Sequence, residues 1–486
     1  MTRSDSWKSR FVLALICAAA AAPASAQTFG TVLSFQQSIS AGSTTALAQG
    51  TDGNLYGVGG GGKYNQGTIF RVAPNGRLTV IYNFCSQYPS CPDGADPVGL
   101  VLGTDGAFYG TAAHGGYNGC EYSCGTLFRI TPDGKFTTLY QFGGFDGSNP
   151  LGGLAEAPDG SFLGTTVTGG ANGGGTVFKT SRQGKLTTIY NFCDRPQCAD
   201  GYQPTSTLSL GVDGSFYGIT SFGGTGENCD GLFYYGCGTA FRITSTGDLT
   251  TLYSFCSAGQ SCADGYGPYS GLLLATDGDF YGVTQTTAFR LTRFGKLTTL
   301  YSFCSKPNCA DGSWAQGELI EGTDRNLYGV TVAGGNEACE GDFGAGCGTI
   351  FDLARSDAFT TLHSFDGTDG ETPLAGLIQA TNGTFYGTTP AGGSNGSGTL
   401  FRLDMGLGPF VAFVRGYGKI EQRAQVLGQG FEGTSAVSFN GTLATFKVVS
   451  DTYLTAMIPQ GATTGYVTVT TPTGVLTSNV PFRVIQ

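Results

Sequence analysis

The residues of this chain whose types and spacing could do chemistry are its cysteines and its acidic side chains. The sequence holds 15 cysteines, and all except Cys17 fall into close pairs along the chain. Pairs of this kind predict local disulfides in an oxidising compartment. Zinc is the alternative use, but no C-x2-C spacing accompanies the pairs, and the chain has only two histidines, His114 and His363. The predicted pairs are Cys85 with Cys91, Cys120 with Cys124, Cys193 with Cys198, Cys229 with Cys237, Cys256 with Cys262, Cys304 with Cys309, and Cys339 with Cys347.

Acidic and aromatic residues near three of these cysteine pairs form a second group of candidates for ligand binding. Two carboxylates could act as acid and base in glycosidic cleavage, and aromatic rings could stack on a sugar or a protein partner. The simpler interpretation is that these side chains only pack or solvate their loops, so no catalytic residue is predicted. The candidates are Glu121, Tyr122, Glu227, Asp230, Tyr234, Tyr235, Glu337, Glu340, Asp342 and Phe343.

A third group is an aspartate that recurs before glycine. Six such carboxylates on one face could bind Ca²⁺ or hydrogen-bond to sugar hydroxyls. An Asx turn, in which the aspartate accepts hydrogen bonds from its own loop, explains a recurrent residue better. We therefore expect no cofactor, and calcium remains only an alternative. The residues are Asp93, Asp146, Asp200, Asp264, Asp311 and Asp366.

The elements that position these residues come from an internal repeat. A Tyr-Gly step recurs with a period of about 55 residues, and a Gly-Thr-x-Phe motif or a close variant follows each step. Each of the seven units contains four short apolar runs; in the second unit they are 99–103, 108–112, 126–131 and 135–142. Glycine accounts for 82 of 486 residues and charged residues for only 12 %, which favours strands joined by turns over helices. The steps begin at Tyr56, Tyr109, Leu163, Tyr217, Tyr281, Tyr328 and Tyr386, with leucine in place of tyrosine in the third unit.

The ends of the repeat predict how it closes. The seventh unit lacks its fourth strand, and residues 31–35, before the first unit, match the missing strand. The first strand can therefore complete the last blade and remove the exposed sheet edges. This arrangement predicts an all-β protein with a seven-bladed β-propeller over 27–407, whereas the alternative, a linear β-solenoid, does not explain the displaced strand.

The repeat resembles the GloVer tandem-repeat family of exported bacterial proteins over about residues 30–404. The motifs that carry the resemblance are Tyr-Gly-x-Thr, a Gly-Gly pair, Gly-Thr-x-Phe-Arg and Lys-Leu-Thr-Thr-Leu-Tyr-x-Phe. The fifth unit departs by losing the Gly-Gly loop, and the sixth has Asp352 where other units carry arginine or lysine. The family is known by its repeat more than by a reaction, so the resemblance implies little about activity.

The C-terminal segment, 408–486, lacks the repeat and reads as short strands with turns at Asn440-Gly441 and Thr473-Gly474. This pattern predicts a small β-sandwich. The run that begins at Val437 and the later Ile458-Pro459 step resemble an IPT/TIG domain, which implies an Ig-like fold and a role as a spacer or binding module.

The N-terminal segment 1–26 reads as a signal peptide. Basic residues precede a short apolar run at 11–22, and an Ala-x-Ala site ends at Ala26. Cys17 raises the alternative of a lipid anchor, but Ile16 stands where a small residue is expected. We expect a secreted or periplasmic protein without a transmembrane segment.

The charge balance and the loop lengths bear on partners. The net charge of -10 disfavours nucleic acid, and a monomer is expected. All predicted disulfides fall in the connections that leave one face of a propeller, and long, rigidified loops often carry binding. The sequence therefore predicts an exported, non-catalytic binding protein for a glycan or a protein. The alternatives are a carbohydrate-active hydrolase or lyase that uses loop carboxylates, and a structural cell-surface protein.

Overall fold

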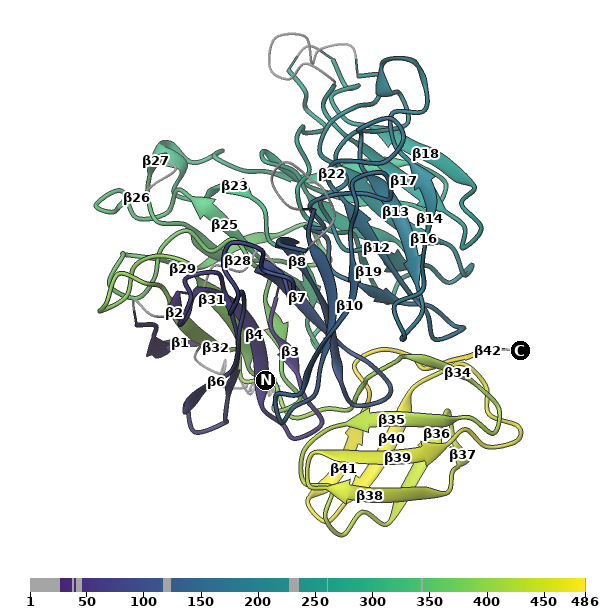
Figure 1. Cartoon of the computed structure of the whole chain (residues 1–486). Helices are drawn as coiled ribbons and strands as arrows, with labels where there is room; N and C mark the ends of the chain where they lie inside the picture. Colours follow the sequence, from purple (N-terminus) through teal and green to yellow (C-terminus); the bar gives the residue numbers. More distant parts are fainter. Residues whose placement is uncertain are drawn as a thin grey trace, which may run out of the picture.

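The chain is an all-β protein in the computed structural model, which describes residues 27–36, 39–40, 46–116, 124–226, 236–259, 261–341 and 344–485. Among these residues the helical elements are two three-residue 3-10 turns, η1 (Pro196–Cys198) and η2 (Pro307–Cys309). Figure 1 shows sheets of the repeat arranged side by side, with a separate C-terminal β-region beneath them. The predicted all-β class with repeated antiparallel sheets is confirmed.

Each repeat unit forms one antiparallel sheet. The first sheet holds β3 (Ala48–Gln49), β4 (Leu55–Gly61), β5 (Thr68–Val72) and β6 (Leu78–Asn83), and β2 (Ile39–Ser40) also pairs with β4. The second holds β7 (Ala95–Leu102), β8 (Phe108–His114), β9 (Thr126–Ile130) and β10 (Phe136–Gln141), and the third holds β11 (Ala155–Glu156), β12 (Phe162–Thr166), β13 (Thr176–Thr180) and β14 (Leu186–Asn191). The fourth holds β15 (Ser209–Leu210), β16 (Phe216–Thr220), β17 (Thr239–Ile243) and β18 (Leu249–Ser254), and the fifth holds β19 (Leu273–Leu274), β20 (Phe280–Val283), β21 (Thr287–Leu291) and β22 (Leu297–Ser302).

The sixth and seventh sheets complete the repeat. The sixth holds β23 (Ser313–Ala315), β24 (Ile320–Glu321), β25 (Leu327–Ala333), β28 (Thr349–Leu353) and β29 (Phe359–Ser364), with a small hairpin of β26 (Glu340–Gly341) and β27 (Gly344–Ala345) beside it. The seventh holds β30 (Ile378–Gln379), β31 (Phe385–Thr389) and β32 (Thr399–Asp404), and β1 (Thr28–Ser34) is its fourth strand. β1 pairs antiparallel with β32, from Thr28 opposite Asp404 to Ser34 opposite Thr399. The expected pairing of the first strand with the last repeat is therefore observed.

The repeated motif is explained by one packing contact in each sheet. The phenylalanine of Gly-Thr-x-Phe is fully buried, as Phe128 is in the second sheet. Its ring lies against the glycine of the Tyr-Gly step, where a Cβ on Gly110 would stand 2.6 Å from the ring carbon Cζ of Phe128. Burying one phenylalanine side chain contributes about 2 kcal/mol. The second residue of the Tyr-Gly step is therefore glycine because a side chain there would collide with the phenylalanine ring.

The C-terminal region packs two sheets against each other. One contains β33 (Ala412–Phe413), β35 (Arg423–Leu427), β39 (Tyr453–Met457) and β38 (Phe446–Ser450). The other contains β37 (Thr442–Leu443), β36 (Ala436–Phe439), β40 (Val467–Thr471) and β41 (Gly474–Thr477), and β34 (Tyr417–Lys419) pairs in parallel with β42 (Arg483–Ile485). A single buried cluster joins side chains of both sheets, among them Val426 and Leu454 from one and Val437 and Val469 from the other.

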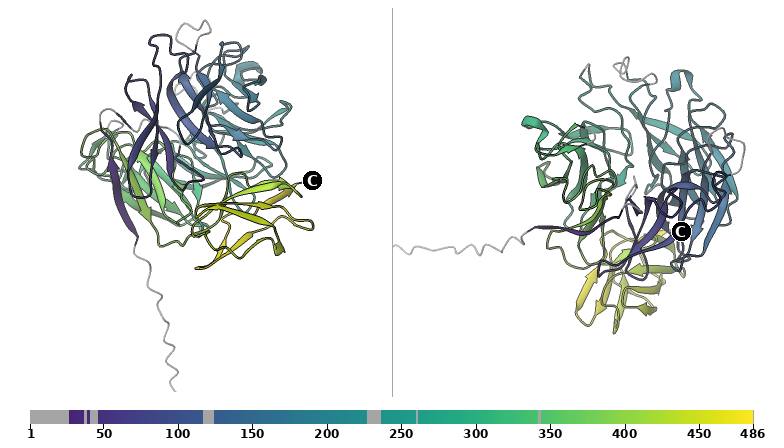
Figure 2. Two further views of the ribbon diagram at one scale, coloured as in Figure 1. Left: turned by 60° about the horizontal axis from the view of Figure 1, so that its bottom comes forward. Right: turned by 60° about the vertical axis from the view of Figure 1, so that its left-hand side comes forward.

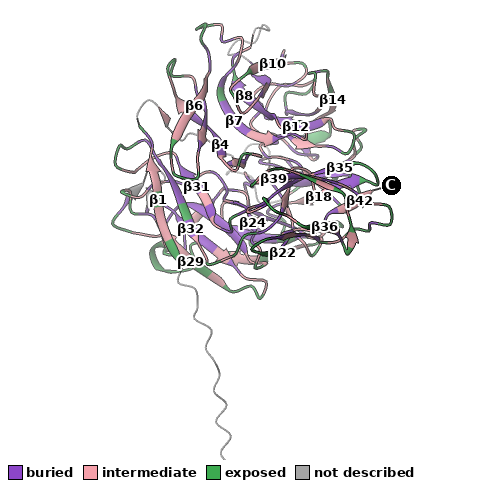
Figure 3. Cartoon of the chain, turned by 90° about the horizontal axis from the view of Figure 1, so that it is seen from below, coloured by how far each residue is buried: buried purple, intermediate pink, exposed green. Residues whose placement is uncertain are grey.

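The repeat has two faces, and the C-terminal region covers one of them. We call the side of the connections between second and third strands, and between successive sheets, the upper face; the tight turns lie on the lower face. On the lower face the C-terminal region hydrogen-bonds to the first, third, fourth, sixth and seventh sheets (Figure 2). The C-terminal region therefore contacts tight turns of sheets that are far apart in the sequence. Figure 3 views the molecule from this side.

Candidate functional site

Disulfides lie in the connections of the upper face. Five of the seven predicted pairs are disulfides: Cys85–Cys91, Cys193–Cys198, Cys256–Cys262, Cys304–Cys309 and Cys339–Cys347. Cys124 and Cys237 are disulfide-bonded as well, whereas Cys120 and Cys229 lie outside the described residues. The sulfur atoms of Cys237, Cys256 and Cys262 lie within 4.8 Å of one another. Because these cysteines are oxidised, they offer no thiolate for the zinc alternative.

The recurrent aspartates anchor their own loops. Asp311 accepts hydrogen bonds from the Tyr301 hydroxyl at 2.7 Å and from the backbone N–H of Ser305 at 2.9 Å and of Lys306 at 3.2 Å. Burial raises the pKa of Asp311, but these donors outweigh burial and leave the pKa below its usual value. Asp93, Asp146, Asp200 and Asp264 accept from the equivalent tyrosine and from loop N–H groups in the same way. The loop-capping interpretation therefore explains these carboxylates.

One member of this series was assigned wrongly from the sequence. In the sixth sheet the anchor is Asp369 rather than Asp366: His363, which replaces the tyrosine, has its Nε2 at 2.7 Å from the Asp369 carboxylate. Asp369 also accepts from the backbone N–H of Asp366. Asp366 instead accepts from the backbone N–H of Thr368. This loop contains two Asp-Gly steps, at Asp366 and Asp369, so the sequence did not show which aspartate is equivalent to Asp311.

A cavity of about 340 Å³, which we call the axial cavity, is lined by residues of the third to seventh units, close to the connections of the upper face. It is built from two rows of residues at the start of the first strands. The outer row holds Leu151, Thr205, Tyr269, Gln316 and Leu374, one from each of the third to seventh units. The inner row lies two residues further along the chain, just before strands β11, β15, β19, β24 and β30. Thr207, Gly271 and Glu318 from this inner row line the cavity, together with Gln203 and Phe222.

Glu318 is the acidic group of this cavity. Burial raises the pKa of its carboxyl group, and hydrogen bonds from the Thr207 side chain and the Gly271 backbone N–H oppose part of that rise. Gly271 gives it room, because a Cβ there would stand 2.2 Å from Oε1 of Glu318. Among the described residues that line the cavity there is no lysine, arginine or histidine. In the described part of the cavity wall, no cation therefore stands beside this carboxylate.

The sequence contained a signal for Glu318 that our reading missed. The inner-row residue is directly followed by a leucine in every unit. The residues at this position in the seven units are Ala46, Gly99, Gly153, Thr207, Gly271, Glu318 and Gly376. Six are small and uncharged, as a narrow axis requires. A glutamate in this column is therefore not explained by the repeat.

The candidates proposed from the sequence are not brought together by the described structure. Glu337 is exposed, and its carboxylate accepts a hydrogen bond from the Asn308 side-chain amide at 2.5 Å. Glu340 lies in the small hairpin strand β26, beside the sixth sheet. The remaining eight candidates lie outside the described residues: Glu121, Tyr122, Glu227, Asp230, Tyr234, Tyr235, Asp342 and Phe343.

Exposed aromatic side chains lie on the connections of the upper face. Tyr88, Phe145 and Trp314 are 73 %, 92 % and 41 % exposed. Tyr88 and Phe145 lie in connections between successive sheets, and Trp314 lies in the short strand β23 that follows such a connection. Trp314 is two residues before Gln316 of the cavity wall. These three side chains add apolar surface to the face on which the cavity lies.

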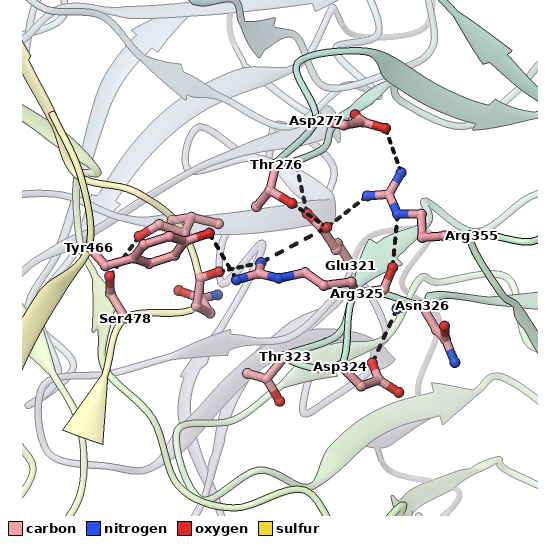
Figure 4. Close-up of polar contacts among 12 residues, drawn as sticks. Thr276, Asp277, Glu321, Thr323, Asp324, Arg325, Asn326, Arg355, Tyr466 and Ser478 are labelled. Carbon is pink, nitrogen blue, oxygen red and sulfur yellow. Dashed lines mark hydrogen bonds and ion pairs between the residues drawn. The ribbon is translucent and has the colours of Figure 1, made fainter. Parts of the chain in front are cut away.

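The lower face carries a different kind of acidic group. Glu321 accepts hydrogen bonds from the backbone N–H and hydroxyl of Thr276 and pairs with Arg355 at 2.7 Å (Figure 4). Arg325, whose guanidinium lies 3.9 Å from Glu321, donates to the Tyr466 hydroxyl and to the carbonyl of Asn479 in the C-terminal region. Every charge in this cluster therefore has a partner, and the cluster ties two sheets to the C-terminal region.

A second acid of the lower face is paired in the same way. Glu156 binds Arg182 at 2.6 Å and lies 3.7 Å from Arg415 of the C-terminal region. The Tyr417 ring lies between the guanidinium groups of Arg415 and Arg483, at 5.2 and 5.4 Å, and its hydroxyl donates to the carbonyl of Glu156. These contacts join the third sheet to the C-terminal region.

A second cavity of about 380 Å³ lies between the first and seventh sheets, against Gln429 of the C-terminal region. Neutral groups and backbone form most of its wall, and Arg402 is the charged residue among the described ones that line it. This cavity lies where β1 pairs with β32 of the seventh sheet. The axial cavity, which gathers side chains from five units around one uncompensated carboxyl group, is the better candidate site.

Known proteins support the repeat and the fold. The model of the Gloeobacter/Verrucomicrobia repeat matches residues 88–288 and 231–442. No curated protein matches the chain. None of the helices in the described parts of the chain is long and apolar enough to cross a membrane.

Several solved structures are similar in fold. A streptogramin B lyase aligns over 78 % of this chain and 97 % of its own, with a TM-score of 0.51 and 16 % identity. A fungal alcohol oxidase of the AA5 family, in complex with copper, aligns over 94 % and 99 %, with a TM-score of 0.51 and 12 % identity. An auxiliary nutrient binding protein from Bacteroides thetaiotaomicron aligns over 78 % and 76 %, with a TM-score of 0.43 and 12 % identity. At these identities the first two establish a shared propeller-like fold alone, and the third is too distant in fold to add to that.

Proposed function

This chain belongs to the Gloeobacter/Verrucomicrobia repeat family, and we propose that it is an exported, non-catalytic binding protein whose ligand occupies the upper end of the propeller axis. The observation that carries the proposal is the axial cavity, which is walled by five units and holds a carboxylate without a cation. Its volume lies at the lower end of the range typical of small-molecule sites.

The architecture that supports this function is a seven-bladed propeller over 27–407, followed by an Ig-like IPT/TIG domain over 408–486. Seven repeat sheets and the pairing of β1 with β32 support the ring. The two packed sheets of the C-terminal region support the Ig-like assignment. Disulfides in the loops support an oxidising compartment, and hence a signal peptide over 1–26 that ends near Ala26.

A glycan is the ligand class that the cavity favours over a protein. Side-chain amides and hydroxyls of Gln203, Thr205 and Gln316 line it and suit the hydroxyl groups of a sugar. Tyr269 and Phe222 add aromatic faces, with ring centroids 6.4 Å apart in an edge-on arrangement. A protein partner would rest instead on the exposed aromatic residues outside the cavity.

The alternative of a glycoside hydrolase or lyase has less support. Glycosidic cleavage typically uses two carboxylates that flank the scissile bond. Among the described residues that line the cavity, Glu318 is the one carboxylate. Binding without turnover therefore fits the arrangement better.

A glycan array probed with the mature chain, residues 27–486, together with reducing-sugar release assays, tests the proposal. We expect binding without turnover, and loss of binding in Gln316→Phe, which places a larger side chain in the cavity wall. Phe294→Ser is the matched control, because Phe294 is 81 % exposed and lies in a lower-face turn. Turnover would favour the hydrolase or lyase alternative. Binding that survives in Gln316→Phe would place the ligand elsewhere, and silence in both assays would leave a structural role.

A further inference from the structure

The axial cavity contains a recognition element more specific than a generic glycan site. Resting on the proposed function, we propose that this cavity selects a saccharide that carries a protonated amino group, which pairs with the carboxylate of Glu318. An amino sugar or a short oligosaccharide of amino sugars has this chemistry.

The wall around Glu318 is formed by residues from five units, and their charges decide what the carboxylate can bind. Of the described residues that line the cavity, Glu318 and Tyr269 are the two with titratable side chains. Burial raises the pKa of the Tyr269 hydroxyl, so this group is neutral at physiological pH. The acid-base pairs His114–Asp96, at 2.9 Å, and His363–Asp369, at 2.7 Å, do not line the cavity. The wall therefore supplies no positive charge to the Glu318 carboxylate.

Two glutamates of the first strands show that the chain can pair such groups. Glu156 and Glu321 are each within 2.7 Å of an arginine, Arg182 and Arg355. A carboxylate that is withdrawn from water without an opposite charge beside it is costly, because its hydrogen bonds replace only part of the lost hydration. Burial indeed raises the pKa of Glu318, which shows that the cavity disfavours its charged form. A ligand ammonium would supply the missing charge and form a charge-assisted hydrogen bond.

The rest of the wall suits the body of a sugar. Glu318 reaches toward the fourth and fifth units, where it meets Thr207 and Gly271. Tyr269 and Phe222 provide aromatic surface within the same cavity, while Gln203 and Thr205 provide neutral polar groups. A saccharide can place its ammonium at Glu318 and its hydroxyls on the amides. Because the C-terminal region contacts the tight turns of the lower face, such a ligand enters from the disulfide-bonded face.

The proposal predicts a specific pH dependence. The ammonium binds the deprotonated form of Glu318, so affinity falls as pH decreases through the raised pKa of this group. Binding also lowers that pKa, so the complex releases protons in the pH range where free Glu318 is still protonated. A neutral sugar of the same size should show neither effect.

Trp314 provides the readout for the test. It is the one tryptophan after residue 26 and lies four residues before Glu318. Its fluorescence is titrated in the mature chain with three matched disaccharides: the glucosamine dimer, the N-acetylglucosamine dimer and cellobiose. We expect the glucosamine dimer to bind at least about tenfold more tightly than the two neutral sugars, since a charge-assisted hydrogen bond exceeds a neutral one by that much.

The variants separate the charge from the shape of the site. Glu318→Gln should lose the tenfold preference for the glucosamine dimer and leave the affinity for the neutral dimers unchanged. Asp194→Asn, a change of the same type on an exposed residue of an upper-face connection, should alter neither. Isothermal calorimetry in two buffers of different ionisation enthalpy should show proton release with the glucosamine dimer in the wild type, and none in Glu318→Gln.

The outcomes distinguish this inference from the proposed function. Equal binding of all three dimers, or a preference that survives in Glu318→Gln, overturns the amino-sugar inference while the glycan-binding function stands. Absence of binding by all three dimers overturns the amino-sugar inference. If the glycan array of the wild type is silent as well, the proposed function fails with it.

Discussion

Two glutamates in one short segment of the sixth unit have opposite surroundings. Glu321 lies 2.7 Å from Arg355 and accepts hydrogen bonds from Thr276, and its side chain is 5 % exposed. Glu318, three residues earlier, lies in the axial cavity with no cation among the described residues around it. This comparison shows that a glutamate has an arginine partner where it helps to hold two parts of the chain together. Where the acid remains unpaired, the fold does not account for it.

The same difference separates the two faces of the propeller. The lower face contacts the C-terminal region, and arginines, glutamates and tyrosines pair with one another there (Figure 4). The upper face holds disulfide-bonded loops, exposed aromatic side chains and the open cavity. One face is therefore an internal interface, and the other is available to a ligand.

The largest effect is expected from breaking the paired acid. Glu321→Ala leaves Arg355 and Arg325 without their shared carboxylate at the interface with the C-terminal region. We expect a loss of about 3 kcal/mol in the free energy of unfolding, because a buried ion pair is costly to break from one side. Urea denaturation of the mature chain measures it, with the exposed Glu337→Ala as the matched control. Equal stability of the two variants would show that the cluster does not hold the interface.

A smaller loss is expected from removing a loop anchor on the upper face. Asp311→Asn weakens bonds to the Tyr301 hydroxyl and two backbone N–H groups and should cost about 2 kcal/mol near neutral pH. Since the folded-state pKa of Asp311 is below its usual value, its stabilisation is complete above the usual pKa and disappears as pH falls through the folded-state value.

Thermal unfolding as a function of pH measures this anchor. The difference between wild type and Asp311→Asn should shrink as the solution becomes acidic. A difference that stays constant with pH would contradict the assignment of a charged anchor to Asp311.

A comparable effect is expected from one disulfide of the upper face. The double variant Cys304→Ser/Cys309→Ser opens a short loop and should cost about 2 kcal/mol, on the chain-entropy estimate. Chemical denaturation with and without a reducing agent measures it, and the reductant should have a smaller effect on the variant than on the wild type. An identical response of both proteins to the reductant would indicate that this bond adds no stability.

The smallest change in stability is expected from replacing Glu318. It has the opposite sign, because this variant should be more stable than the wild type. Burial raises the folded-state pKa of Glu318, so its contribution to stability is lost as pH rises through that pKa. Glu318→Gln should therefore raise the Tm by about 2 °C at neutral pH and leave it unchanged in acid. Differential scanning calorimetry decides, and a lower Tm of this variant at neutral pH would assign Glu318 a structural role.

Much of the architecture could be predicted from the sequence, because a repeat shows each local rule several times. The Tyr-Gly step, the Asp-Gly loops and the displaced strand β1 all follow from such repetition. The assignment of Asp366 as an anchor was wrong because the sixth unit has two Asp-Gly steps and a histidine in place of tyrosine, so repetition no longer determined the register.

The site was predicted less well, for a physical reason. Charged and aromatic residues were sought in the long loops, where composition draws attention. Glu318 lies in the short segment between β23 and β24, and its meaning appears only when the seven units are aligned and its neighbours from other units are known. Contacts between blades depend on ring closure, which no single unit encodes.

The most direct test of the account is a crystal structure of the mature chain with the glucosamine dimer bound. The account predicts ligand density in the axial cavity, with the amino group within hydrogen-bond distance of the Glu318 carboxylate and a sugar face against Tyr269. Density confined to the outer loops of the upper face, or an empty axial cavity at saturating ligand, would contradict it.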